Sequence, residues 1–472
     1  MMFRMTLVVV AIVLGVATLI CAVLRFSEQS AISPWEPAIA MEAMRWLAGM
    51  PVYESAHATH MYGPLLTVFI AAVFQFSGLN LLVARVAMSV FSLALAALLS
   101  SVLCRGNNRK YWFLAFVLFL GLSFRTNLVL FSAQPDGAAA FLGVAALCLW
   151  IRRKRVRLGL LISIGFFLCA MLFKQTTAAF ALVPAVYALV WRRTASAFLA
   201  AAIPIIAIAA TLGAIDLFWP QVFAGMVSVP ASIQVNYARI VPTLLYFIGT
   251  FPIFLLAVIA GIVASDEDTE EGRWIWSAIV VLVPVSVWTM CKSGGSYNSL
   301  LLGYIAISAL VIVRLDSISK WVGSLRPESA VVACVFVAGV MLFSFFVQYH
   351  RDLVLAFTRV GNDKYSAVVE YGRRLPGPVV SPQDPTIAYR AQGRFGRALL
   401  FELDAHAVNG NWPDTLPESV GQELDQAKFV IQAESYVPTP VFERGLRSRG
   451  FQPLAISEFA GSPYTVWEKQ DR

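Results

Sequence analysis

Long apolar runs alternate with short polar breaks over roughly the first three quarters of this chain, from residue 5 to residue 347. The runs approach the length that an α-helix needs to cross the hydrocarbon core of a bilayer, roughly 20 residues. The pattern therefore predicts a multi-pass α-helical membrane protein with about eleven spanning helices. The predicted spans are 5–25, 79–104, 111–131, 137–151, 158–173, 176–191, 197–218, 241–264, 274–291, 298–314 and 330–348.

One further apolar stretch, 62–76, is short for a span and contains Pro64 and Gln75. If it crossed the membrane, the basic residues at 105–110 and the basic cluster at 152–157 would lie outside the cell. Lys and Arg concentrate in cytoplasmic loops, so 62–76 is predicted to be re-entrant or to lie on the membrane surface. The chain then starts in the cytoplasm, and its C-terminal tail lies outside.

Beyond residue 360 the apolar runs become short, and Pro, Gly and charged residues are frequent. Short strands are predicted at 378–381, 428–432 and 464–467, with helices between them, one of them at 442–449. This alternation predicts a small soluble α/β domain, 360–472, behind a membrane domain, 1–350, whose first outer loop is 26–78. The tail has no Gly-rich phosphate loop and no nucleophile elbow, so we expect it to dock or to bind an acceptor.

Composition supports an integral membrane protein, since 58% of the residues are hydrophobic, 14% are charged and the mean hydropathy is +0.71. The net charge of +8 would suit a nucleic-acid ligand, but the basic residues cluster in short loops. No basic face or stacking platform accompanies them, so no nucleic-acid partner is expected. The six cysteines include no CxxC pair, and they predict neither a disulfide framework nor a zinc site.

The predicted topology collects polar residues on the outer face, and ionisable residues at membrane depth are candidates for function. Glu36 follows the first span and precedes an amphipathic helix, with Ala40, Ala43, Met44 and Leu47 on one side, that we expect to lie on the membrane surface. A carboxylate at that boundary can act as a general base toward a hydroxyl. The alternative is a solvated loop acid without chemistry.

A second acid, Asp136, stands at the start of a predicted span, where it can also serve simply as a helix N-cap. Lys174 interrupts an apolar sequence between two spans and can instead be a snorkelling anchor. Further cations on the same face are Lys292, Arg125 and Arg85. Several cations with two acids suit a substrate that carries phosphate.

The order of these motifs resembles the GT-C superfamily of polyprenyl-phosphate-sugar-dependent glycosyltransferases. It is closest to bacterial membrane proteins related to protein O-mannosyltransferases and lipid A aminoarabinose transferases. The resemblance covers about residues 5–350. It rests on the outer-loop acid, Tyr62-Gly63-Pro64, Arg85, Gln134-Pro135-Asp136, Phe173-Lys174-Gln175-Thr176, and Lys292 to Asn298.

The resemblance implies an inverting single displacement at the outer, periplasmic face of a bacterial cytoplasmic (inner) membrane. Glu36 would deprotonate the hydroxyl of a glycan, lipid or protein acceptor, and Asp136 would orient it or hold a divalent cation if one is used. The residues expected to bind the donor and its phosphate are Arg85, Arg125, Lys174, Gln175, Lys292, Asn298 and Tyr62.

This chain departs from the family at two places. Glu36 stands where an Asp is commoner, and Tyr62-Gly63 replaces a charged pair that usually contacts phosphate or metal. His57 and His60 are the candidates to replace that contact. Two other functions stay open: a transporter or flippase for a lipid or glycan, although no internal repeat is evident, and a catalytically inactive scaffold of the same fold.

Overall fold

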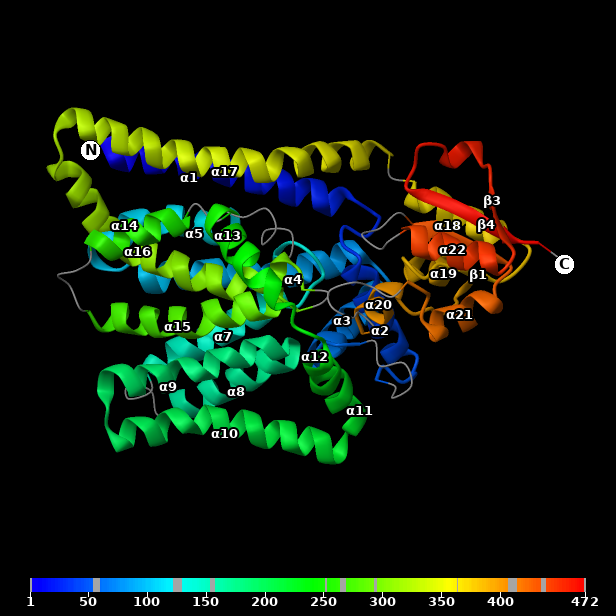
Figure 1. Cartoon of the computed structure of the whole chain (residues 1–472), viewed down its shortest axis with the longest axis horizontal. Coiled ribbons are helices and arrows are strands. Elements are labelled where there is room, and N and C mark those ends of the chain that lie inside the picture. Colours follow the sequence, from blue (N-terminus) through cyan, green and yellow to red (C-terminus); the bar gives the residue numbers. More distant parts are fainter. Residues whose placement is uncertain are drawn as a thin grey trace.

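The computed structural model describes residues 2–53, 60–121, 130–152, 158–250, 253–263, 269–292, 295–362, 364–405, 414–433 and 439–470. A bundle of long helices occupies one part of the molecule, and a smaller region made from the C-terminal residues lies at one end of it (Figure 1). Two of the predicted site residues, Arg125 and His57, lie outside the described residues.

The helices of the first three quarters follow one another with short connections. They are α1 (Met2–Ser27), α2 (Trp35–Leu47), α3 (Pro64–Ser77), α4 (Leu81–Leu103), α5 (Trp112–Gly121), α7 (Asp136–Arg152), α8 (Gly159–Phe173), α9 (Val183–Tyr187), α10 (Ala195–Phe218), α11 (Pro220–Phe223), α12 (Val229–Ser232), α13 (Ile240–Thr250), α14 (Ile253–Val263), α15 (Glu270–Met290), α16 (Leu301–Ser324) and α17 (Pro327–Asn362).

Within the described residues, five helical stretches are long and apolar enough to cross a membrane: α1, α4, α10, α15, and α16 with the turn before it. Their outer surfaces are apolar as well. Leu19 on α1 is 64% exposed, and Leu199 on α10 is 72% exposed. Rows of exposed apolar side chains along whole helices are unfavourable in water and favourable in lipid. The chain is therefore a membrane protein.

Each of the eleven predicted spans coincides with one helix or with consecutive helical segments in the described part of the chain. The excluded stretch forms α3, whose 14 residues extend about 21 Å, less than the roughly 30 Å of a hydrocarbon core. The number of crossings stays a prediction, because several other helices are also shorter than a span.

The centre of the bundle is α16. Every residue from Leu301 to Ile312 is buried, and this helix packs against α14 and α15. α1 lies beside α17 along one side of the bundle, whereas α8, α9 and α10 lie on the opposite side (Figure 1).

The C-terminal region contains four strands and five helices among its described residues. They are α18 (Tyr365–Arg374), β1 (Val379–Val380), α19 (Pro385–Gln392), α20 (Leu399–Ala405), α21 (Glu418–Asp425), β2 (Phe429–Ala433), α22 (Thr439–Ser448), β3 (Phe451–Leu454) and β4 (Tyr464–Lys469).

The strands form one sheet in the order β1-β2-β4-β3, with β1 parallel to β2 and the other neighbours antiparallel. Alternate residues of β2 face opposite sides, as strand geometry requires. Phe429 and Ile431 pack with α18 and α19, and Val430 packs with α20, α21 and α22. β1, β2 and β4 lie where the sequence predicted strands, whereas β3, which contains Pro453, was not predicted.

The first outer loop lies between the bundle and the C-terminal region (Figure 1). The predicted amphipathic helix is present as α2 and ends before Gly49, whose φ is 70°. It packs against α3 on one side and against α19 and α20 on the other. Its polar residues Glu42 and Arg45 are buried by neighbouring protein. That α2 lies on the membrane surface stays a prediction.

Candidate functional site

A cavity of about 400 Å³ opens where α8, α10, α15 and α16 end or begin near the first outer loop. Its size is within the usual range for small-ligand pockets. Five predicted site residues line it: Tyr62, Lys174, Gln175, Lys292 and Asn298. The other lining residues are Trp35, Met61, Met171, Thr176, Ala178, Leu212, Met226, Val227, Pro230, Ala231, Ile233, Thr289, Gly295, Ser296, Ser299 and Phe401.

The backbone break after α8 places Lys174 at the cavity. α8 ends at Phe173, Lys174 is extended, and a 3₁₀ helix begins at Gln175. The neighbouring wall approaches closely at Gly63, where a Cβ atom would lie 2.0 Å from the carbonyl oxygen of Leu172. Only glycine allows this approach. Gly63 thus allows the segment with Tyr62 to pack closely against the end of α8.

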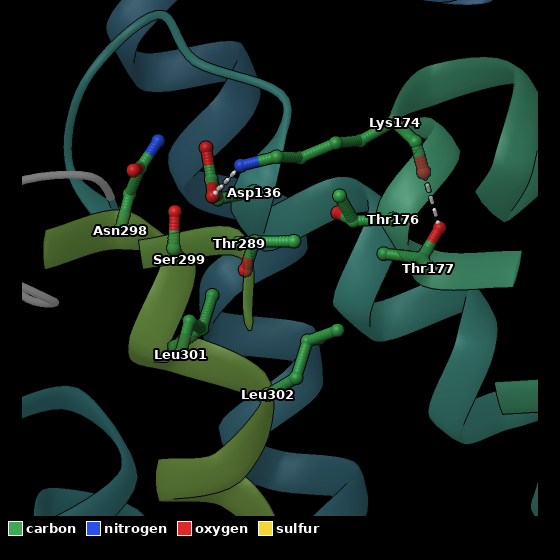
Figure 2. A pocket seen from close by; sticks show the side chains of 9 residues that line it. All are labelled: Asp136, Lys174, Thr176, Thr177, Thr289, Asn298, Ser299, Leu301 and Leu302. Atoms are coloured by element: carbon green, nitrogen blue, oxygen red, sulfur yellow. Dashed lines mark hydrogen bonds and ion pairs between the residues drawn. The ribbon is translucent and has the colours of Figure 1, made fainter. Parts of the chain in front are cut away.

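Lys174 pairs with Asp136, the first residue of α7, with its Nζ 2.5 Å from Oδ1. Figure 2 shows this pair with the Asn298 and Ser299 side chains on the facing segment. The four residues line a small niche of about 20 Å³ beside the larger cavity. This volume corresponds to about one water molecule or one hydroxyl group.

The second oxygen of Asp136 is free to react. Oδ2 is buried and has no hydrogen-bond partner among the described residues. A buried carboxylate oxygen without a donor is costly, and such an atom calls for an explanation. Because the Asp136 side chain lines a polar niche beside a cavity, Oδ2 can accept a hydrogen bond from a hydroxyl group that enters there.

Lys292 provides a second cation. Its Nζ donates to the carbonyl oxygen of Pro230 at 2.6 Å, and partial burial lowers the pKa of its ammonium group. One hydrogen bond leaves two further N–H groups on the ammonium. Gln175 is anchored by its Nε2, which donates to the carbonyl oxygen of Met61 at 2.9 Å. These contacts tie the α10–α13 connection and the first outer loop to the two lysines.

The cavity has two chemically different sides. Lysines, amides and hydroxyl groups come from the ends of α8, α15 and α16. The segment from Leu212 on α10 to Ile233 after α12 contributes apolar side chains, Met226 and Val227 among them. Such a combination suits a ligand with an anionic head and an apolar chain.

Glu36 and Arg85 lie elsewhere and are not among the residues that line the cavity. Both side chains are 0% exposed, and Arg85 Nη2 is 2.8 Å from Glu36 Oε2. Glu36 Oε1 also accepts from Arg85 Nε at 3.0 Å and from the Ala133 N–H at 2.9 Å. Oε2 accepts from the Ile32 N–H at 2.9 Å.

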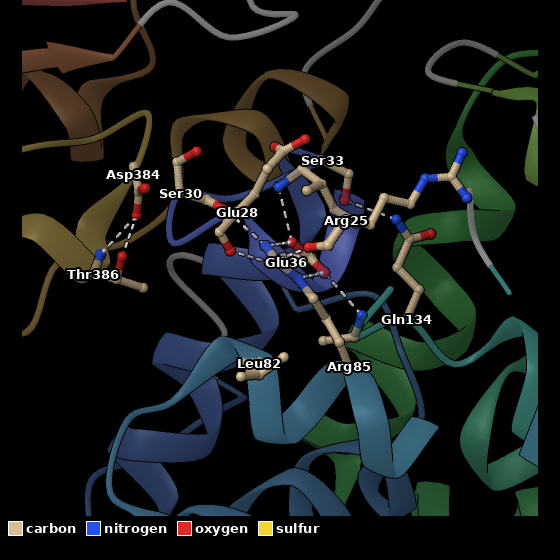
Figure 3. A network of polar contacts seen from close by, with 12 residues as sticks. Arg25, Glu28, Ser30, Ser33, Glu36, Leu82, Arg85, Gln134, Asp384 and Thr386 are labelled. Atoms are coloured by element: carbon tan, nitrogen blue, oxygen red, sulfur yellow. Dashed lines mark hydrogen bonds and ion pairs between the residues drawn. The ribbon is translucent and has the colours of Figure 1, made fainter. Parts of the chain in front are cut away.

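The remaining donors of Arg85 bind the backbone after α1. Nη1 donates to the carbonyl oxygens of Arg25 and Glu28, at 2.9 and 2.6 Å, and Nη2 donates to that of Ser30 at 2.6 Å (Figure 3). The sequence-based roles of Glu36 as a base and of Arg85 as a phosphate ligand are therefore not supported. Both residues use their hydrogen-bonding capacity inside the protein.

The same network does reach Asp136 through the backbone. Gln134 Nε2 donates to Ser33 Oγ at 2.8 Å, and Ala133 is held by Glu36. Glu36 and Arg85 thus fix the segment that leads into α7.

His60 is not exposed to a ligand. It is 1% exposed, its Nε2 lies 2.9 Å from Thr67 Oγ1, and Tyr53, Tyr62 and Phe401 surround its ring. Burial, and secondarily the Arg397 charge, lower the pKa of His60 to about 3. No group of three or more His, Cys, Asp or Glu residues suited to a metal ion occurs in the described part of the chain.

Sequence reasoning missed several lining residues. Thr289 and Ser299 stand next to predicted residues, and proximity to Lys292 and Asn298 could have indicated them. Trp35 and Phe401 give no such signal, because aromatic residues of that kind occur throughout the chain.

Comparison with solved structures identifies the fold. The structure of ArnT from Cupriavidus metallidurans bound to undecaprenyl phosphate matches with a TM-score of 0.58 and 15% identity, over 98% of this chain and 99% of that one. ArnT from the same organism in the apo state matches with a TM-score of 0.53, 15% identity and the same coverage. No family model and no curated protein sequence matches this chain.

At this level of identity the likeness shows the fold: this chain has the fold of ArnT over nearly its whole length.

Proposed function

We propose that this chain, which has the ArnT fold, is a membrane glycosyltransferase that moves a sugar from a polyprenyl phosphate to an acceptor hydroxyl. The observation that carries the proposal is the Asp136–Lys174 pair beside the cavity. In the pair, a carboxylate oxygen that has no partner among the described residues lies beside an ammonium group, and a second lysine, Lys292, lines the same cavity. The ArnT structure with bound undecaprenyl phosphate supports the choice of donor.

The two sides of the cavity suggest how the donor binds. The apolar segment from Leu212 to Ile233 would contact the isoprenoid chain, and Lys174 and Lys292 would contact the phosphate. Asn298 and Gln175 would position the sugar through hydrogen bonds. Two cations near one phosphate stabilise the charge that develops as it leaves.

The reaction would be a single inverting displacement. The acceptor hydroxyl donates its proton to Asp136 Oδ2, and its oxygen bonds to the anomeric carbon. The bond from that carbon to the phosphate oxygen breaks on the opposite side, and polyprenyl phosphate leaves. Asp136 thereby takes the role that the sequence suggested for Glu36. This scheme requires no metal ion.

The direction of the helices supports a site at the outer face. The cavity lies at the end of the bundle where α7 and α16 begin and α8 and α15 end. At the other end of these helices lie basic residues, including Arg105, Arg152, Arg192 and Lys320. Because basic residues mark the cytoplasmic side, the cavity and the C-terminal region would face the periplasm.

The test is sugar transfer by the purified chain in lipid nanodiscs, with radiolabelled undecaprenyl-phosphate sugars as donors and a lipid A or glycan extract as acceptor. We expect transfer by the wild type and a loss of about 10²–10⁴-fold in Asp136→Asn. Asp316→Asn is the matched control, since Asp316 forms an equally short pair with Lys110 at the opposite end of the bundle. It should retain activity.

Two outcomes would contradict the proposal. Movement of the lipid across proteoliposome membranes without sugar transfer would favour a flippase. Binding of undecaprenyl phosphate without transfer from any donor in the panel would favour an inactive scaffold.

A further inference from the structure

The helix α20 belongs to two apolar clusters at once. Leu399, Leu400 and Leu403 pack into the core of the C-terminal region. Phe401, together with Ala398, packs into the cluster made by the first outer loop and the start of α7. Phe401 is also the single residue of the C-terminal region among the described residues that line the cavity. The C-terminal region thus supplies part of the cavity wall.

The ring of Phe401 is fixed by aromatic neighbours. Its centroid lies 5.9 Å from that of Tyr62 and 6.1 Å from that of His60, and both pairs are edge-to-face. Edge-to-face packing is a favourable arrangement for aromatic pairs. His60 is itself held by Thr67, and Tyr53 donates its hydroxyl to the carbonyl oxygen of Tyr62 at 2.7 Å. The wall behind Phe401 is therefore closely packed.

Contacts outside the aromatic group also join the C-terminal region to the first outer loop. Arg397, one turn before Phe401, lies 4.0 Å from Glu42 of α2. Arg390 on α19 donates to the carbonyl oxygen of Leu79 at 2.5 Å. A wall that is held from both sides cannot retreat to admit a larger ligand, so its position limits what the cavity accepts.

The position of Phe401 in the cavity indicates which part of the ligand it meets. The lysines form the phosphate end, and the residues of α10–α12 form the apolar side. Trp35, Tyr62 and Phe401 come from the outer loop and the C-terminal region, which lie at the end away from the bundle (Figure 1). A group attached to the phosphate and directed away from the membrane would meet these aromatic residues.

We propose that Phe401 is a specificity-determining residue that limits the size of the group carried on the phosphate. This inference rests on the proposed function. A cavity of about 400 Å³ is near the lower end of the range for ligand pockets. The loss of one aromatic ring would therefore enlarge it substantially.

The experiment measures binding of three lipids to the full-length chain in nanodiscs: undecaprenyl phosphate, the same lipid carrying one hexose, and the same lipid carrying a disaccharide. We expect the wild type to bind the first two and to bind the disaccharide lipid at least about ten-fold more weakly, the scale on which pocket size discriminates. In Phe401→Ala, the affinity for the disaccharide lipid should rise to nearly that for the two smaller lipids. The affinity for undecaprenyl phosphate should stay within about two-fold of the wild-type value.

The matched control is Phe442→Ala. Phe442 has the same 1% exposure as Phe401 and packs in the core of the C-terminal region. This control distinguishes an effect of a wider cavity, expected only for Phe401→Ala, from an effect of weaker packing in the C-terminal region, expected for both variants. Phe401→Leu keeps most of the apolar volume, and we expect it to give an intermediate effect. If Phe401→Ala does not fold, the same binding measurements on Phe401→Leu test the inference.

Several results would overturn the inference. They are equal binding of all three lipids by the wild type, equal changes for all three lipids in Phe401→Ala and Phe401→Leu, and recovery of disaccharide binding in Phe442→Ala. Absence of undecaprenyl phosphate binding by the folded wild type would instead contradict the proposed function. The two failures are therefore distinguishable.

Discussion

Two buried pairs of an acid and a cation lie close together in this protein, and they differ in how completely they are satisfied. In the Glu36–Arg85 pair, both carboxylate oxygens accept two hydrogen bonds each, and the guanidinium binds three backbone carbonyl groups as well. In the Asp136–Lys174 pair, one carboxylate oxygen is bound by the lysine and the other has no partner among the described residues.

The difference separates a structural pair from a candidate for chemistry. A carboxylate that already accepts four hydrogen bonds cannot take a proton from a substrate without losing contacts that hold the fold together. A carboxylate with a free oxygen beside a cavity can do so at little cost to the structure. Both residues carry a carboxylate and both were predicted to lie on the outer face, so the contacts are what distinguish them.

The largest expected effect is on the rate of sugar transfer, when both residues of a pair are replaced together. Asp136→Asn combined with Lys174→Met should reduce sugar transfer by about 10³-fold or more, because a base and a charge-stabilising group are both lost. Glu36→Leu combined with Arg85→Met should reduce it far less. Initial rates of both double variants, measured at saturating donor, test this contrast. Equal losses in folded proteins would show that the two pairs do not differ in role.

The next effect concerns stability. Arg85→Met alone leaves the Glu36 carboxylate buried without its cation and should lower the free energy of unfolding by about 3–5 kcal/mol. Adding Glu36→Leu should restore part of that loss, since it removes the buried uncompensated charge, whereas the backbone groups that the two side chains bind still lose these hydrogen bonds. Thermal unfolding in detergent, followed by tryptophan fluorescence, measures both. A double variant no more stable than Arg85→Met would count against this account.

A smaller effect is expected at the second lysine of the cavity. Lys292→Met removes one of two cations near the proposed phosphate position and leaves the Asp136–Lys174 pair intact. We expect the KM for the donor to rise about ten-fold, the scale of one charged hydrogen bond, with a smaller change in kcat. Steady-state kinetics over a range of donor concentrations measures both constants. A loss confined to kcat would assign Lys292 a role in the transition state instead.

The smallest effect is expected at His60. Like Asp136, His60 has a buried atom without a partner among the described residues, its Nδ1. Its ring, however, is packed against aromatic side chains. Burial lowers its pKa from 6.5 to about 3. Its contribution to stability is therefore complete above pH 6.5 and is lost as the pH falls toward 3, by up to about 1.4 kcal/mol per pH unit. His60→Gln should weaken the decline of Tm between pH 7 and pH 5. An unchanged decline would contradict the assignment to His60.

The sequence indicated several of the residues that line the cavity and its niche. Lys174 and Asp136 are ionisable residues that interrupt apolar runs, and such residues can be recognised without any knowledge of the fold. Lys292 was named as a further cation of the same face, and Asn298 through the family resemblance. Glu36 carried the same signal as Asp136 but lies in a fully hydrogen-bonded buried pair, and its partners Arg85 and Ala133 are 49 and 97 residues away in the chain. Sequence spacing contains no information about such contacts.

The sequence by itself determined the membrane character, the position of most helices of the membrane domain and three of the four strands. These features depend on local hydrophobic pattern and on the length of each apolar run. Only the tertiary structure decided which acid is satisfied, which cations share a cavity, and that Phe401 lines it. Each depends on residues far apart in the chain meeting in space, where burial and the count of hydrogen bonds set the cost and the chemistry of a charged group.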